Sequence, residues 1–68
     1  MILVVDSGST KTDWIALDNN GKIKFSTQTR GMNPRVLSSS IISERIINNF
    51  DLYHNRNSVS KIYFYGAG

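Results

Sequence analysis

The stretch from Asp6 to Thr12 holds the residue types best suited to chemistry. It reads Asp-Ser-Gly-Ser-Thr-Lys-Thr and follows a short apolar run. Gly8 removes a side chain where the backbone could approach a ligand, and successive N–H groups in a tight turn can form a concave anion site. Lys11 adds a mobile positive charge, and Asp6 could hold Mg²⁺ through water. The residues alone leave a second interpretation open, a polar hairpin loop whose Asp6 and Ser9 only satisfy backbone groups.

The pattern differs from two common phosphate-binding motifs. A P-loop needs two glycines, a Gly-Lys-Ser/Thr ending and a following helix, and a dinucleotide fingerprint also opens a helix. Here the apolar content of residues 12–18 predicts a strand after the loop. The loop is therefore expected to connect two antiparallel strands.

Three strands are expected in the first part of the chain. Residues 2–5 form a continuous apolar run typical of a central strand. Residues 12–18 and 22–29 follow as strands, joined at Asn19-Asn20-Gly21, whose residue types tolerate the positive φ of a tight hairpin turn. In residues 22–29, Ile23 and Phe25 alternate with lysine and serine, which predicts one buried face and an edge protected by lysines.

A helix and a fourth strand are expected in the rest of the chain. Apolar residues recur at helical spacing from Leu37 to Phe50, and a serine among residues 38–40 can cap the helix start. Residues 51–60 are polar and turn-like, residues 61–65 form a strand, and Gly66-Ala67-Gly68 begins a glycine-rich loop. The resulting order is β-β-β-α-β in a mixed sheet, with the strands in the spatial order three, two, one, four and strand four parallel to strand one.

A single helix can cover only one face of this sheet. Tyr63, Tyr65 and half of the first strand would then lie exposed, and large exposed apolar patches normally mark a missing partner. We therefore expect residues 1–68 to be the first part of a larger, truncated domain. We also expect the isolated chain to self-associate, through strand four or through the uncovered face.

Composition narrows the function classes. The net charge is +3, but the eight basic residues are scattered, which argues against a nucleic-acid partner. There is no cysteine, so no disulfide or thiolate metal site can form, and the single histidine, His54, sits in a polar segment and is expected to be exposed. No apolar stretch is long enough to cross a membrane or act as a signal peptide, so a cytoplasmic location is expected. The run Tyr63-Phe64-Tyr65 fits a strand core better than a base-stacking platform.

The sequence from Ile2 to Trp14 resembles the first phosphate motif of the actin-like, sugar-kinase and heat-shock-chaperone ATPase superfamily. That motif is a strand, then Asp-x-Gly-x-Thr, then a second antiparallel strand. The Ser-Thr-Lys-Thr-Asp version, with Gly31-Met32-Asn33-Pro34 downstream, is most similar to the N-acetylglucosamine kinase branch, grouped with BadF/BadG-type ATPases. The resemblance covers the whole chain and implies a partial ribonuclease H-like (actin-like ATPase) domain.

The resemblance also implies roles for particular residues. Asp6 would position the metal, the loop would contact the phosphates of ATP, and Asn33 would contact the sugar, although Asn before Pro is also ordinary turn chemistry. The cofactors implied are ATP and Mg²⁺. The cofactor-binding positions are Asp6, Gly8, Ser9, Thr10, Lys11 and Thr12. Asp13 matches an acidic position for which we expect a hydrogen-bonding or surface role.

The parent protein is thus expected to be an ATP-dependent amino-sugar kinase, a phosphotransferase. No catalytic base is expected within residues 1–68, so the isolated chain should be inactive. The nearest alternative is an ATPase that activates a partner enzyme, as in the BadF/BadG group. A third alternative, from another class, is a small basic binding module.

Overall fold

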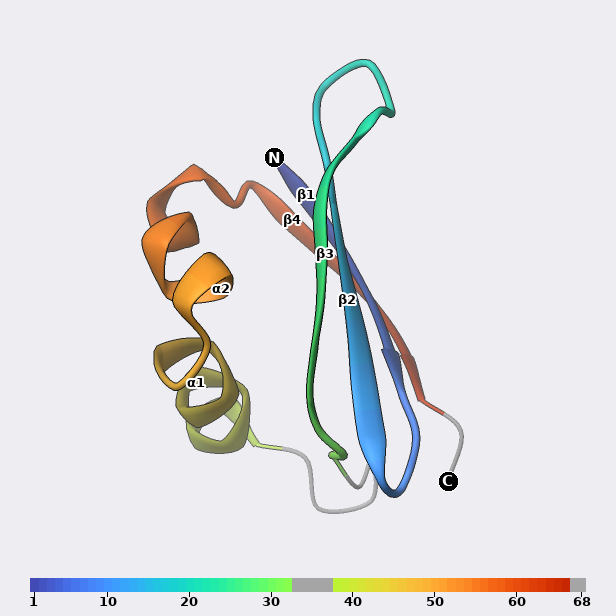
Figure 1. The fold of residues 1–68 in the computed structure, drawn as a ribbon, viewed down its shortest axis with the longest axis vertical. Helices are drawn as coiled ribbons and strands as arrows, with labels where there is room; N and C mark the ends of the chain where they lie inside the picture. The colour runs from blue at the N-terminus through green and yellow to red at the C-terminus, as the bar shows by residue number, and fades with distance from the viewer. Residues whose placement is uncertain (33–37, 67–68) are drawn as a thin grey trace.

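The computed structural model describes residues 1–32 and 38–66, which form a sheet with helices on one of its faces (Figure 1). Along the chain the strands are β1 (Ile2–Ser7), β2 (Lys11–Leu17), β3 (Ile23–Arg30) and β4 (Lys61–Gly66). The helices are α1 (Ser39–Ile47), α2 (Phe50–His54) and the short 3₁₀ helix η2 (Arg56–Ser58). Within the described residues, no helix is long and apolar enough to span a membrane.

The sheet has the strand order β3-β2-β1-β4, as the sequence predicted. β2 runs antiparallel to both β1 and β3, whereas β4 runs parallel to β1. A parallel neighbour needs a crossover connection, and α1 and α2 lie in that connection. The sheet is therefore mixed, and β3 and β4 are its edges.

The predicted hairpin turn between β2 and β3 is confirmed. Gly21 has a φ of 81°, and it is the only described residue with a φ in the left-handed region. The Asp18 carboxylate accepts hydrogen bonds from the N–H groups of Asn20 and Lys22, at 2.8 and 2.9 Å. Glycine is needed here because residues with a side chain rarely adopt this φ.

The core lies between the sheet and the helices. The fully buried apolar residues come from β1, β2, the segment after β3 and α2: Leu3, Val5, Trp14, Ala16, Met32 and Leu52. On the opposite face of β4, Tyr63 and Tyr65 are 45% and 61% exposed, as expected from the alternation. This uncovered face is called the open face below.

Several expectations about apolar residues are wrong. Ile47, part of the predicted helical stripe, is 61% exposed, and Ile62 on the helix-side face of β4 is 46% exposed. Ile23 is 67% exposed, because a register shift between Ala16 and Leu17 pairs it with Leu17, and Leu17 does not belong to the buried set. Phe50 is 80% exposed, because the predicted helix 37–50 is interrupted.

The interruption has a clear local cause. Asn48 ends α1, and the side chain of Asn49 accepts a hydrogen bond from the Leu52 N–H at 3.1 Å, which caps a new helix. The polar segment 51–60, expected to be turn-like, therefore contains α2 and η2. Ser38 caps α1 as predicted, through a bond from the Ile41 N–H. Gly66 ends β4 instead of beginning a loop, and the remainder of the expected glycine-rich loop, like Leu37, lies outside the described residues.

Candidate phosphate-binding hairpin

The loop expected to bind phosphate forms the tight connection between β1 and β2. The Gly8 N–H donates to the Lys11 carbonyl at 2.9 Å, which closes the hairpin. Ser9 and Thr10 are exposed at its tip. Within residues 1–32 and 38–66, neither their N–H groups nor their hydroxyls have a hydrogen-bond partner. Among the described residues, the tip therefore presents donors without partners, of the kind that bind anions.

Asp6 lies at the carboxyl end of β1 and is exposed. Together with the hairpin and Asp13 it lines an open hollow of about 390 Å³. Lys11, which is also exposed, lines the same hollow. The structure thus brings together Asp6, Gly8, Ser9, Thr10 and Lys11, five of the positions singled out in the sequence.

Thr12 has a different place from the one its motif position suggested. Its side chain is fully buried, and its hydroxyl donates to the Arg30 carbonyl at 3.1 Å and lies 3.0 Å from the Ser7 hydroxyl. Because successive side chains of a strand point to opposite faces, Thr12 lies on the helix side while Lys11 and Asp13 lie on the open face. The Thr12 hydroxyl therefore holds the base of the hairpin and does not face the hollow.

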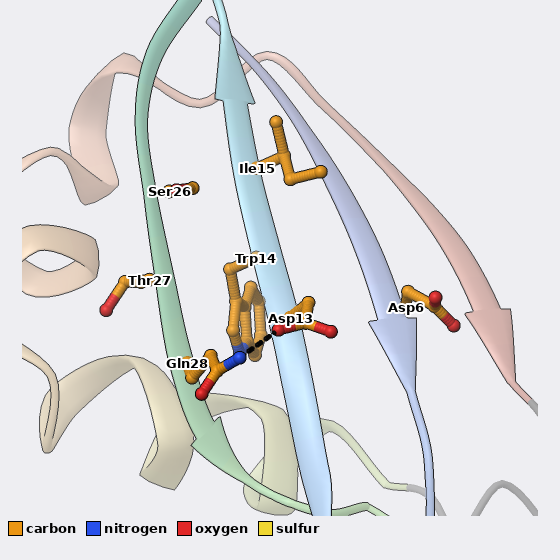
Figure 2. Close-up of a pocket in the computed structure, with 7 residues that line it drawn as sticks. All are labelled: Asp6, Asp13, Trp14, Ile15, Ser26, Thr27 and Gln28. Carbon is orange, nitrogen blue, oxygen red and sulfur yellow. Dashed lines mark hydrogen bonds between the residues drawn. The ribbon is translucent and has the colours of Figure 1, made fainter.

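Asp6 and Asp13 are direct cross-strand neighbours on the open face. Asp13 accepts a hydrogen bond from the Gln28 side chain at 2.7 Å (Figure 2), in line with the hydrogen-bonding role expected for it. These three residues also line a second hollow along the open face, of about 430 Å³. Gln28 donates to only one of the two acidic side chains, so Asp6 keeps both carboxylate oxygens available among the described residues.

The segment after β3 is hydrogen-bonded to the hairpin and to the end of β1. The Gly31 N–H donates to the Thr10 carbonyl at 3.1 Å. The Ser7 hydroxyl donates to the Met32 carbonyl at 2.9 Å and accepts from the Met32 N–H at 3.1 Å. Ser7 and Met32 are both fully buried, so this support is shielded from water.

Sequence reasoning overlooked the residues that build this support. Ser7 could have been found, because alternation from Leu3 and Val5 places it on the buried face, where a hydroxyl needs a partner. The sequence marks Gly31 only as the first residue of the Gly31-Met32-Asn33-Pro34 pattern, and its contact with the hairpin is a tertiary feature. Asn33, the expected sugar contact, lies outside the described residues. His54 is exposed, as predicted, and its ring stacks on Phe50.

The fold and hairpin define a small α/β unit with a mixed four-stranded sheet and an exposed, donor-rich turn at the end of β1. Among solved structures, the chain is similar to a protein from Porphyromonas gingivalis described as a "Putative N-acetylglucosamine Kinase". The TM-score is 0.76 and the sequence identity is 38%. No protein-family model and no curated protein matches the chain.

The likeness to this structure covers 100% of the present chain and 24% of the other protein. The chain thus spans about a quarter of the length of this relative. The resemblance to an N-acetylglucosamine kinase-like segment, carried in the sequence by the residues around Asp6–Asp13, is confirmed.

Proposed function

We propose that this chain is the phosphate-binding segment of an ATP-dependent amino-sugar kinase of the N-acetylglucosamine type, within a ribonuclease H-like domain. The observation that carries the proposal is the hollow shared by Asp6 and the Gly8–Lys11 hairpin, in a chain that is 38% identical to the Porphyromonas protein. A carboxylate suits a metal ion, and N–H donors suit phosphate oxygens. A hollow lined by both therefore suits a metal–triphosphate better than a hollow lined by either group alone.

The residues present fit ATP and Mg²⁺. When bound, Mg²⁺ would neutralise charge on the phosphates, and charge neutralisation is a main part of what a phosphoryl-transfer site provides. Asp6 would hold the metal, through water molecules. The Ser9 and Thr10 donors would bind phosphate oxygens, and Lys11 would add positive charge beside them. The buried Ser7–Met32 bond and the partly buried Thr12–Arg30 bond would keep this hairpin in place before the nucleotide arrives.

Substitution of Asp6 tests this proposal in the longer protein that we propose carries the chain. Asp6→Asn keeps the shape of the side chain but removes its charge, so kcat for the sugar should fall at least tenfold at low Mg²⁺, while the melting temperature stays close to that of the wild type. The matched control is Asp13→Asn, which alters the neighbouring carboxylate on the same face and should cost far less. An unchanged kcat for Asp6→Asn would refute the metal role.

The choice of substrate is tested by sugar dependence. With N-acetylglucosamine present, ADP should form together with a sugar phosphate. ADP formation that is independent of any sugar would favour the alternative of an ATPase that activates a partner enzyme.

A further inference from the structure

Arg45 of α1 reaches across to the segment that supports the hairpin. Its Nη2 donates to the Gly31 carbonyl at 3.1 Å, and its Nε donates to the Arg30 carbonyl at 3.4 Å. The same guanidinium forms an ion pair with Glu44. Only 17% of the Arg45 side chain is exposed. A planar guanidinium can serve two carbonyls and a carboxylate at once, which an ammonium group does less well.

Gly31 connects the segment held by Arg45 to the hairpin. Its N–H is bonded to the Thr10 carbonyl, and a Cβ built on Gly31 would lie 2.5 Å from the Ser9 carbonyl oxygen. The two backbones are therefore in direct contact, and a displacement of Gly31 must displace Ser9 and Thr10. These are the two residues whose donors are exposed at the hairpin tip.

From this chain of contacts we infer that Arg45 is a positioning residue for the phosphate-binding hairpin. It fixes Arg30 and Gly31 against helix α1, and Gly31 in turn fixes the Ser9 and Thr10 donors relative to Asp6. The inference rests on the proposed function for its consequence in catalysis, but the contact itself can be tested without any nucleotide. A residue that only fastened α1 to the sheet would leave the hairpin tip unchanged when it was replaced.

Arg56 provides a matched control. It also donates to a backbone carbonyl, that of Tyr53 at 2.6 Å, and its guanidinium lies 3.8 Å from the centre of the Tyr53 ring. Its hydrogen bond lies within the α2–η2 region and does not involve the hairpin or Gly31. Arg45→Gln and Arg56→Gln therefore remove the same charge and the same kind of hydrogen bond at two places in the fold.

The first experiment is amide hydrogen exchange and ¹⁵N NMR of the full 68-residue chain without ligand. In Arg45→Gln, the Gly31 amide should exchange roughly tenfold faster and the Ser9 and Thr10 amide signals should shift, because the Arg45 bonds no longer hold Gly31. The Ser60 amide, which is bonded to the Met1 carbonyl, should keep its rate. Arg56→Gln should leave all four amides as in the wild type. In Arg45→Lys, the Gly31 amide should exchange at a rate between those of the wild type and Arg45→Gln. If Arg45→Gln does not fold, Arg45→Lys serves as the test variant in its place.

The second experiment measures Mg·ATP use by the longer protein. Arg45→Gln should raise the KM for Mg·ATP by about tenfold with a smaller change in kcat, since the phosphate donors are misplaced in the ground state as well. The inference would be overturned if, in Arg45→Gln, the Gly31 amide exchanged at the wild-type rate and the Ser9 and Thr10 signals did not shift. Equal effects in Arg56→Gln would also overturn it. If Gly31 loses protection but the wild-type protein does not use ATP, the positioning role stands and the proposed function fails.

Discussion

Replacing Gly31 by alanine should loosen the proposed phosphate-binding hairpin and destabilise the whole chain. The new Cβ would lie 2.5 Å from the Ser9 carbonyl oxygen and 2.6 Å from that of Gly8. Real Cβ atoms essentially never approach a neighbour more closely than 3.0 Å, and both neighbours are backbone atoms of a closed hairpin. Neither can rotate away, so one of the two backbone segments has to move.

The magnitude follows from the steric clash and from the hydrogen bond that Gly31 donates. Overpacking of this kind costs about 1–3 kcal/mol, and loss of the Gly31–Thr10 hydrogen bond adds about 1 kcal/mol. The free energy of unfolding should therefore fall by roughly 2–4 kcal/mol, a large share of the ~5–15 kcal/mol typical of a domain. At about 4–8 °C per kcal/mol for a chain of this size, the melting temperature should drop by at least ~8 °C.

Thermal unfolding followed by circular dichroism and by Trp14 fluorescence measures this effect, at one fixed protein concentration. The control is Gly8→Ala in the same hairpin, where the new Cβ would lie 3.5 Å from the Lys11 carbonyl oxygen, an ordinary contact. Gly8→Ala should therefore change the melting temperature by only a few degrees. A Gly31→Ala variant that melts within ~2 °C of the wild type, or a Gly8→Ala variant that is equally destabilised, would refute the steric reasoning.

Three further predictions concern the chain and its proposed parent. Asn33→Ala in the longer protein should raise the KM for the sugar with little change in ATP binding, and an unchanged KM with a lower melting temperature would leave Asn33 as a turn residue only. The isolated chain should give no sugar-dependent ADP in a coupled assay with ATP, Mg²⁺ and N-acetylglucosamine, because we place the catalytic base outside residues 1–68; clear turnover would contradict this. The isolated chain should also self-associate through its open face or the β4 edge, since Ile23, Tyr63 and Tyr65 are exposed; sedimentation showing a monomer at high micromolar concentration would argue against this.

The strand arrangement could be predicted because its signals are local. The apolar run of β1, the Asn-Asn-Gly turn and the alternation in β4 each fix one element, and the helical crossover makes β4 parallel to β1. The start of α1 is equally predictable from its serines. These features depend on residues that are close together in the sequence.

Most of the features that the sequence did not predict depend on interactions between different elements of the fold. Ile23 follows the strand alternation in sequence, but the register shift at Ala16/Leu17 pairs it with Leu17. The interruption of the predicted helix is a local effect, because Asn48 ends α1 and the Asn49 side chain caps α2. The Asn49 side chain also donates to the Thr27 hydroxyl on β3. In the site, the exposed positions Asp6 and Ser9–Lys11 follow from residue type, and the burial of Ser7 follows from the strand alternation. Gly31 and Arg45 act through tertiary hydrogen bonds that no spacing rule encodes.

We propose that the Asp6–Lys11 hairpin binds the phosphates of Mg·ATP. The most direct test is a ¹⁵N NMR titration of the wild-type and Asp6→Asn chains with Mg·ATP, with adenosine as a ligand that lacks phosphate. We expect the amide signals of Gly8, Ser9, Thr10 and Lys11 to shift with Mg·ATP and not with adenosine. We also expect Asp6→Asn to weaken the response to Mg·ATP. Unmoved hairpin amides at millimolar Mg·ATP, or shifts confined to residues outside the hairpin, would contradict it.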